Sequence, residues 1–381
     1  MRLPWYFSAL LLKFSRKYDI IKYNCFKKGN KAMAKIRVAV LFGGATKDHK
    51  LSLRSAYSVL NGLSREKYDI TPLGITRGGR WLYFPGDYDE IPTGEWENNS
   101  DCCSAVISPD PIHAGILTVM DDGTTTFKRV DVVFSALHGK YGEGGRIQSL
   151  LKLAKIPYCD CNPDTAGYCI DKKMTHALLR EAGIPVPRFT CLERGDLNEI
   201  DSKIKNVEAQ LSYPVYVSAS SCSSSIGADL ATNTEELKKA AKIAFSHHHT
   251  AIVEEFLTGR SLCCIVTGGT YDIRVSSIGE TVKTPLKSEF ASYTAEFVPN
   301  AQLTDEQKKQ IRDYAVRAYK ILNFSGFAKI SFVLNNGEIL LRRVTALPGF
   351  SEESAMPMLM NESGFEYGEM LDMLISSAIE G

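Results

Sequence analysis

The sequence lacks an excess of charge of either sign and lacks any long apolar segment. Lys and Arg together number 45 against 44 Asp and Glu in 381 residues, so bulk charge gives no reason to expect a nucleic-acid or acidic-membrane partner. No apolar run reaches the roughly 18 residues that a membrane-spanning helix needs. With 44% hydrophobic residues, the chain is predicted to be a soluble globular protein of two or three domains.

The ten cysteines show no spacing typical of a metal or redox site. They include the adjacent pairs 102–103 and 263–264 and a Cys-x-Cys at 159–161, and none of these fits a zinc ribbon or a redox Cys-x-x-Cys. Scattered thiols in a long chain are typical of a reducing compartment. We therefore predict structural or incidental thiols and a cytoplasmic location, and a metal site is the less favoured alternative.

The first 32 residues differ from the rest in charge. Met1 to Ala32 holds eight basic residues and one acid, which leaves 37 basic and 43 acidic residues, a net charge of about −6, from Met33 onward. Leu3 to Leu12 is apolar, but Lys13 ends it and no small-residue cleavage site follows, so a signal peptide is not expected. Two alternatives stay open for 1–32: translation starts at Met33, or the segment is a basic surface anchor.

Strands and helices alternate along the remaining chain. Residues 36–42 form a β-branched run typical of a buried parallel strand, and helical spacing follows at 51–63. This alternation predicts an α/β fold whose N-terminal domain holds a doubly wound parallel sheet, with an inserted hairpin region at 83–129. Further strands are predicted at 68–75, 130–137, 215–217, 226–230, 251–257, 262–268, 273–279, 326–334 and 338–345. Further helices are predicted at 147–154, 171–182, 234–245, 304–322 and 367–379.

Four glycine- or serine-rich loops follow predicted strands, which is where ligand sites lie in α/β folds. They are residues 42–49, 137–145, 218–227 and 347–351. Such loops can direct backbone N–H groups at a phosphate. Each alone is more typical of a plain turn, but their order and spacing together are informative.

Read together, these motifs resemble the D-alanine–D-alanine ligases, members of the ATP-grasp superfamily, from about residue 36 to 381. The resemblance rests on short runs spread along the chain: Leu-Phe-Gly-Gly (41–44), Leu-His-Gly (137–139), Tyr-Gly-Glu (141–143), Asp171-Lys172, Ser-Ser-Ile-Gly (224–227), Val-Glu-Glu-Phe-Leu (253–257) and Leu-Pro-Gly-Phe (347–350). It implies three domains: an N-terminal α/β substrate domain (33–160) and two α+β ATP-grasp domains (161–256 and 257–381) that enclose the nucleotide.

Such ligases phosphorylate one D-alanine carboxylate and let the amine of a second attack it. This chemistry needs cations on the phosphates and carboxylates that hold magnesium. At the positions that resemblance assigns to magnesium, this chain has Ser331, Arg343 and Thr345, which are poor ligands for that ion. The other departures are Ser218 for the phosphate lysine, Ser261 for the ribose acid, Cys222 for a glutamate, Lys50 and Gly144 for acids, and an unrecognisable lid loop at 284–299.

Other positions match the family. Lys172 matches an ATP-contacting lysine, and Glu254, Glu255, Phe256 and Leu257 match the hinge that receives adenine. The catalytic positions are Asp48, Ser224 and Lys329, of which Asp48 and Lys329 replace a glutamate and an arginine. The substrate-binding positions are His138, Gly349 and Ser354.

These departures predict a ligase relative that is catalytically inactive, with a binding or regulatory role linked to cell-wall precursor metabolism. We expect weak ATP binding at most and no Mg²⁺. We also expect a D-amino acid or nucleotide as ligand, and a homodimer or a complex with an active ligase. The alternative is an active D-alanine–D-alanine or D-alanine–D-2-hydroxy acid ligase with relocated metal ligands, for which Glu352 and Glu353 are the candidates. Lys172 and Glu254 could equally form an ordinary salt bridge, and 247–249 (His-His-His) is expected to cap a helix.

Overall fold

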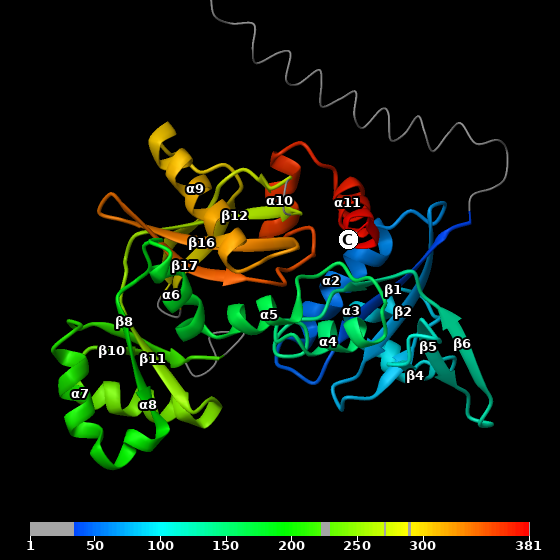
Figure 1. The fold of residues 1–381 in the computed structure, drawn as a ribbon, viewed down its shortest axis with the longest axis horizontal. Helices are drawn as coiled ribbons and strands as arrows, with labels where there is room; N and C mark the ends of the chain where they lie inside the picture. Colours follow the sequence, from blue (N-terminus) through cyan, green and yellow to red (C-terminus); the bar gives the residue numbers. More distant parts are fainter. Residues whose placement is uncertain (1–33, 222–228, 270–271, 289–290, 381) are drawn as a thin grey trace, which may run out of the picture. The chain divides into compact units, whose positions relative to one another are not determined.

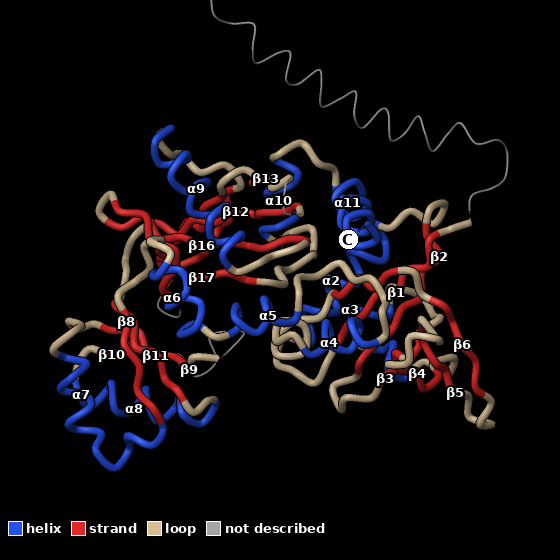
Figure 2. The backbone as a smooth tube through the Cα atoms, in the orientation of Figure 1, coloured by secondary structure: helices blue, strands red, loops and turns tan. Residues whose placement is uncertain are grey.

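The computed structural model describes residues 34–221, 229–269, 272–288 and 291–380. The chain divides after Lys35, and the unit from Ile36 to Gly381 holds every element described below (Figures 1 and 2). The predicted extension at 1–32 lies outside the described residues. No helix in the described ranges is both long and apolar enough to cross a membrane.

The first sheet has seven strands in the order β6-β5-β4-β3-β2-β1-β7. β1 pairs in parallel with β2 and β7, which confirms the predicted parallel strands, and the remaining pairs are antiparallel. The stretch predicted as a hairpin region therefore extends this sheet, which is mixed rather than wholly parallel. Its elements are β1 (Ile36–Gly43), α2 (His49–Gly62), β2 (Tyr68–Ile75), β3 (Trp81–Tyr83), α3 (Glu90–Thr93), η1 (Glu95–Asn98), β4 (Cys103–Ile107), β5 (Gly115–Val119), β6 (Thr125–Arg129), β7 (Val132–Ser135) and α4 (Arg146–Leu153).

The second sheet is antiparallel, in the order β10-β9-β11-β8. Alternate residues of β9, such as Val215 and Val217, are buried against α7 and α8, whereas Tyr216 and Ser218 face the other way because side chains alternate along a strand. The elements are α5 (Pro163–Ile170), α6 (Lys172–Glu181), β8 (Phe189–Glu193), η2 (Arg194–Glu199), α7 (Ile200–Glu208), β9 (Val215–Ala219), β10 (Asp229–Ala231), α8 (Thr234–His247) and β11 (Thr250–Glu255).

The third sheet has the order β15-β14-β12-β16-β17, and β13 pairs with β12. Ile330, Phe332 and Leu341 are buried in a core that α9 covers, and α9 lies against this sheet in Figure 1. Its elements are β12 (Arg260–Gly268), β13 (Arg274–Val275), β14 (Gly279–Ser288), β15 (Ala291–Val298), α9 (Asp305–Ile321), β16 (Gly326–Asn335), β17 (Glu338–Thr345), α10 (Ala355–Glu362) and α11 (Tyr367–Glu380).

One predicted strand differs from the structure for a visible reason. The strand expected at 273–279 ends after Val275, and β14 begins at Gly279. Between them the Ser276 hydroxyl accepts a hydrogen bond from the Ile265 N–H at 2.9 Å and donates one to the Ser277 carbonyl at 2.7 Å. Because a side chain takes the bond that a neighbouring backbone carbonyl would otherwise accept, the ladder is interrupted there.

Candidate functional site

The positions that the resemblance assigns to magnesium lie on one face of the third sheet. Strand register sets Ser331 of β16 opposite Arg343 of β17, and Lys329 opposite Thr345. Paired residues of neighbouring strands present their side chains to the same face, so these four residues form one patch. The patch holds two hydroxyls and two cations, and it contains no carboxylate.

A buried acid from the first sheet's loops meets this patch. Glu143 Oε2 lies 3.8 Å from Arg343 Nη2, and the two side chains are only 12% and 30% exposed. The Gly139 N–H also donates to Glu143 Oε1 at 3.1 Å. Burial raises the pKa of Glu143 to about 7, against the opposing effect of Arg343, and Asp48 raises it further while Lys329 lowers it. Asp48, Glu143, Lys329 and Arg343 are therefore one electrostatic cluster.

The arrangement of this cluster does not fit magnesium. Mg²⁺ prefers oxygen ligands of high negative charge in an octahedral set, whereas the matched positions hold Ser331, Thr345 and the Arg343 guanidinium. A guanidinium repels a divalent cation, and a neutral hydroxyl cannot compensate for that repulsion. In the described part of the chain, no three His, Cys, Asp or Glu side chains come together in a way that could hold a metal ion.

The matched substrate-binding residues come together in a second cluster. His138 is buried, and its Nε2 lies 3.0 Å from Ser55 Oγ, which also accepts the Phe350 N–H at 3.2 Å. A Cβ on Gly349 would come within 2.6 Å of Ser354 Oγ and 4.0 Å of His138 Cε1, so the three residues lie against one another and a side chain at position 349 would displace the Ser354 hydroxyl. Burial lowers the pKa of His138 to about 4, and the ring is neutral at pH 7.

Asp48 and Gly139 connect the two clusters. Gly139 has a φ of +72°, and a Cβ there would also lie 2.8 Å from Asp48 Oδ2. Left-handed backbone and the close carboxylate both exclude a larger residue at this position. The matched catalytic residues Asp48 and Lys329 are thus brought near the same acid, Glu143. The third, Ser224, and the substituted Cys222 lie outside the described residues.

Beside the second sheet, Lys172 and His176 both pair with Glu254. Lys172 Nζ lies 2.6 Å from Glu254 Oε2, and His176 Nε2 lies 2.9 Å from Glu254 Oε1. Burial alone would raise the pKa of Glu254, but the Lys172 ammonium and His176 outweigh it and lower the value to about 2. Lys172 also lies 5.5 Å above the ring of Tyr216, which pairs with Glu254 across β9 and β11.

Ser218 stands where the family has its phosphate-binding lysine. It is on the same face of β9 as Tyr216 and is 5% exposed. Its hydroxyl is buried without a hydrogen-bond partner among the described residues. A buried hydroxyl of this kind carries no charge, so it cannot replace the missing ammonium.

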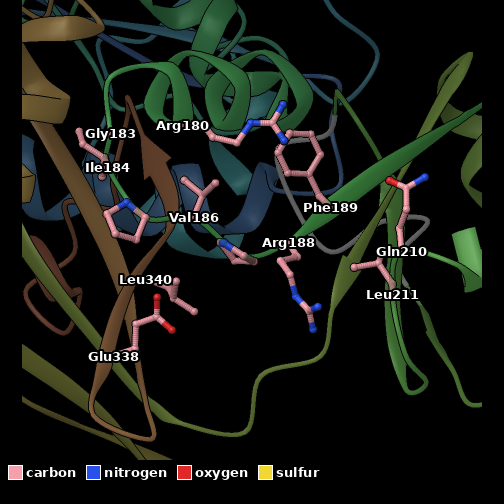
Figure 3. Close-up of a pocket in the computed structure, with 12 residues that line it drawn as sticks. Arg180, Gly183, Ile184, Val186, Arg188, Phe189, Gln210, Leu211, Glu338 and Leu340 are labelled. Atoms are coloured by element: carbon pink, nitrogen blue, oxygen red, sulfur yellow. The ribbon is translucent and has the colours of Figure 1, made fainter.

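The matched hinge residues separate into paired and exposed groups. The Arg188 N–H and Nε donate to the Glu255 carboxylate at 2.8 and 2.9 Å. Phe256 is 42% exposed, Leu257 is half-buried, and Ser261 on β12 is half-buried opposite Val333. A hollow of about 560 Å³ lies beside this hinge, lined by Arg180, Arg188, Phe189, Leu340 and neighbours, and it includes none of the candidate site residues predicted from the sequence (Figure 3).

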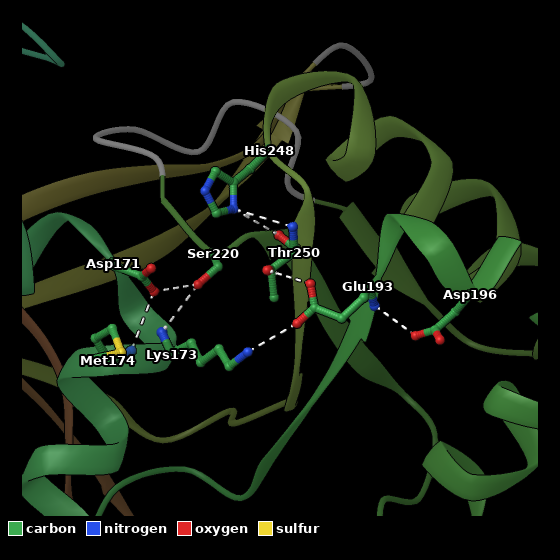
Figure 4. Close-up of polar contacts among 8 residues, drawn as sticks. All are labelled: Asp171, Lys173, Met174, Glu193, Asp196, Ser220, His248 and Thr250. Carbon is green, nitrogen blue, oxygen red and sulfur yellow. Dashed lines mark hydrogen bonds and ion pairs between the residues drawn. The ribbon is translucent and has the colours of Figure 1, made fainter.

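A polar network fastens the start of α6 to the second sheet (Figure 4). The Ser220 hydroxyl donates to Asp171, and the Lys173 N–H donates to Ser220 Oγ at 3.3 Å. Lys173 Nζ also donates to Glu193 at 2.9 Å, and the Thr250 hydroxyl donates to the same carboxylate at 2.7 Å. The network holds Lys172, the first residue of α6, in place beside Glu254.

Comparison with known proteins identifies the family. The family model for the D-ala D-ala ligase N-terminus matches residues 37–161, and the model for the D-ala D-ala ligase C-terminus matches residues 178–376. The chain belongs to the D-alanine–D-alanine ligase family. This confirms the resemblance and the ATP-grasp fold predicted from the sequence.

Two curated relatives and one solved structure illustrate the similarity. The D-alanine--D-alanine ligase of Thermoanaerobacter sp. (strain X514) is 36% identical over 358 residues, 91% of this chain and 98% of the relative. The vancomycin/teicoplanin A-type resistance protein VanA of Enterococcus faecium is 33% identical, covering 92% and 100%. The crystal structure of the VanG D-Ala:D-Ser ligase from Enterococcus faecalis matches with a TM-score of 0.83 and 31% identity, covering 91% and 100%.

Glu143 gives the ligase-family site a measurable pH dependence. Its folded pKa of about 7 is above the ordinary 4.5, so between pH 4.5 and 7 the unfolded chain releases a proton that the folded chain keeps. The contribution of Glu143 to stability is therefore full below pH 4.5 and falls by about 3 kcal/mol as the pH rises to 7. Urea titrations at several pH values between 4.5 and 7 measure this. As the pH rises, the free energy of unfolding of Glu143→Gln should fall less than that of the unsubstituted protein. An equal fall in both proteins would contradict the assignment to Glu143.

Proposed function

We propose that this member of the D-alanine–D-alanine ligase family is non-catalytic and acts as a binding or regulatory protein in cell-wall precursor metabolism. The observation that carries the proposal is the pairing of Ser331 with Arg343 across β16 and β17, with Arg343 directed at Glu143. A cation held by a buried acid occupies a position where the family needs a magnesium ligand. Metal clamping of phosphates contributes several kcal/mol to transition-state stabilisation, so its loss removes orders of magnitude in rate.

The cluster of matched substrate-binding residues supports a retained binding role. His138, Gly349 and Ser354 keep the identities that resemblance assigns to substrate contacts, and they lie against one another. We infer that a D-amino acid, or another small molecule with a carboxylate, binds beside these residues. The protein partner that we propose is a second copy of this chain or an active ligase.

The rival proposal, an active ligase with relocated metal ligands, depends on Glu352 and Glu353. Both are exposed. The pKa of Tyr367 on α11 is raised mainly by the burial of its phenol and, to a smaller extent, by the Glu352 carboxylate. Glu352 therefore lies near α11, whereas Lys172 is paired with Glu254.

An assay of ADP release decides between the two proposals. The protein is incubated with magnesium-ATP and millimolar D-alanine, and the D-alanine--D-alanine ligase of Thermoanaerobacter sp. serves as the positive control. We expect no D-alanine-dependent ADP release above a no-enzyme blank. Turnover within about a hundredfold of the control, against the usual 1–10³ s⁻¹, would overturn the non-catalytic proposal, and substitution of Glu352 and Glu353 would then test the relocated ligands.

A further inference from the structure

A buried acid that the candidate site does not use lies beside the loop that carries Glu143. Asp160 is 5% exposed, and Gln148, in the first turn of α4, is 1% exposed. Gln148 Nε2 donates to Asp160 Oδ2 at 2.9 Å and to the Gly142 carbonyl at 2.6 Å. One side-chain amide therefore joins this acid to the backbone next to Glu143.

Two oxygens at this contact have no donor among the described residues. They are Asp160 Oδ1 and Gln148 Oε1, and both are buried. A glutamine oxygen can only accept, and the two amide hydrogens of Gln148 are already directed at Gly142 and Asp160. An ionised carboxylate can also only accept, so it would leave two buried acceptors unsatisfied, which is costly. A proton on Asp160 Oδ1 supplies the one donor that satisfies both oxygens.

The groups around Asp160 supply no positive charge to an ionised carboxylate. Within the described residues, Asp160 takes part in no ion pair. Burial raises the pKa of Asp160 well above its ordinary value, and the hydrogen bond from Gln148 opposes that increase. Burial likewise raises the pKa of the nearby thiols and phenols, which are therefore uncharged at pH 7. They are those of Tyr158, Cys159, Cys161, Cys169 on α5 and Tyr319 on α9.

We propose that Asp160 is a neutral carboxylic acid whose proton lies between its Oδ1 and Gln148 Oε1, and that this acid–amide pair fastens the 139–143 loop. The bond at 2.9 Å between the other two atoms lets the acid and the amide lie side by side, joined by two hydrogen bonds. Loss of the proton to solvent would set two acceptors against each other. The loop would then be held less firmly, and with it Glu143, which lies 3.8 Å from Arg343.

Infrared spectroscopy on the full chain tests for the proton directly. A protonated carboxyl group absorbs apart from carboxylates, and ordinary aspartates are ionised at pH 7. We expect a carboxylic-acid band at pH 7 that is lost in Asp160→Asn. Glu143 also holds a proton in part near this pH, so Glu143→Gln is the matched control and should keep the Asp160 band. A band that Asp160→Asn leaves unchanged would overturn the proposal and favour a water molecule that donates to both oxygens of an ionised carboxylate.

The pH dependence of unfolding is a second test, and its sign is defined. In Asp160→Asn the new amide can donate to Gln148 Oε1, so the pair keeps two bonds without a titrating proton. Because the folded pKa of Asp160 is above the ordinary 3.8, the contribution of the proton is full below that pH and is lost as the pH rises toward the folded value. From about pH 4 upward, the unfolding equilibrium constant of the unsubstituted protein should rise about tenfold per pH unit relative to Asp160→Asn. Glu143 titrates in both proteins and cancels, so an equal pH dependence would overturn the proposal.

Hydrogen exchange tests whether the pair fastens the loop. Gln148→Met removes both bonds of the amide at similar side-chain length, so the Glu143 N–H, which donates to the Gly139 carbonyl at 2.8 Å, should exchange about tenfold faster. Lys152→Met, exposed on the same helix, is the control and should exchange normally. Gln148→Asn, whose shorter amide cannot reach both partners, is the second variant should Gln148→Met not fold. Unchanged exchange in the folded variant would overturn the fastening of the loop.

The acid–amide pair does not depend on the proposed function, because Asp160 and Gln148 lie outside the family's matched positions. D-alanine-dependent ADP release tests whether the protein is a ligase, and it leaves the infrared band and the pH dependence of Asp160→Asn unaffected. Failure of one proposal is therefore distinguishable from failure of the other.

Discussion

Replacing Ser218 by lysine and Arg343 by glutamate should raise the affinity for magnesium-ATP by roughly a hundredfold or more. The lysine would direct an ammonium at the phosphates from the buried end of β9, and such a charged hydrogen bond contributes about 1.5–3 kcal/mol. The glutamate would replace a repelling guanidinium by a metal ligand beside Glu143, where Arg343 now lies 3.8 Å from that acid. Titration calorimetry with ATP, with and without magnesium, measures the change.

The strand register of the third sheet indicates a third substitution that should increase the affinity further, and a control variant. Ser331 is directly opposite Arg343, so adding Ser331→Asp should place two carboxylates on one ion and increase the gain. Arg342→Glu makes the same charge change at the neighbouring residue of β17, which has no partner in β16 because Arg343 is opposite Ser331 and Leu341 is opposite Phe332. It should not create magnesium dependence. An affinity that stays at the level of the unsubstituted protein would mean that these positions do not correspond to the family's phosphate and metal residues.

The sequence predicted the family because its signals are local. Gly139 and Gly349 stand in short runs with local constraints: a left-handed turn at Gly139 and a close approach to Ser354 at Gly349. Residues with such local constraints are readable from a motif. The parallel strands were equally readable because β1 is buried on both faces, which gives a continuous apolar run.

The partners of the site residues were not predictable in the same way. Glu143, in the loop after β7, and Arg343, on β17, are 200 positions apart, and nothing in the spacing of either indicates the other. His176 is one turn after Lys172 on α6, which could have suggested a shared partner, but the partner, Glu254, comes from β11. Ser55 lies on α2 and His138 lies in the loop after β7, 83 positions later, so the spacing of neither residue indicates the contact between them.

An irregularity in strand pairing at Arg342 was also not predictable from the sequence. Arg343 is opposite Ser331 but Leu341 is opposite Phe332, so Arg342 is an extra residue in β17. Alternation along 338–345 predicts that consecutive residues face opposite sides of the sheet. The register shift between Ser331 and Phe332 breaks this rule at the arginine pair. No residue type in the run signals an inserted position, because the irregularity is a property of two paired strands rather than of one.

Replacing Glu254 by alanine should cost about 3–5 kcal/mol of unfolding free energy, the range for removal of one partner from a buried ion pair. Lys172 would lose its only ion-pair partner among the described residues, and the fully buried His176 would lose its only hydrogen-bonded carboxylate there. Both side chains would remain away from water, at 17% and 1% exposure. Urea unfolding of the variant and the unsubstituted protein measures the difference.

Glu193→Ala is the matched comparison, because it also removes a glutamate paired with a lysine of α6. There both side chains are 43% exposed, so the ion pair contributes about 0–1 kcal/mol. Loss of the bond from the Thr250 hydroxyl to the same carboxylate adds about 1–2 kcal/mol, and the total stays below the cost expected for Glu254→Ala. Glu254→Gln, which keeps a hydrogen-bond acceptor, should fall between the two. If Glu254→Ala costs no more unfolding free energy than Glu193→Ala, the contacts of Glu254 with Lys172 and His176 do not stabilise the fold. Lys172 would then be better explained as a ligand-binding residue that pairs with Glu254 when no ligand is bound. A loss in the expected range means that Lys172 and Glu254 stabilise the fold whether or not a ligand binds.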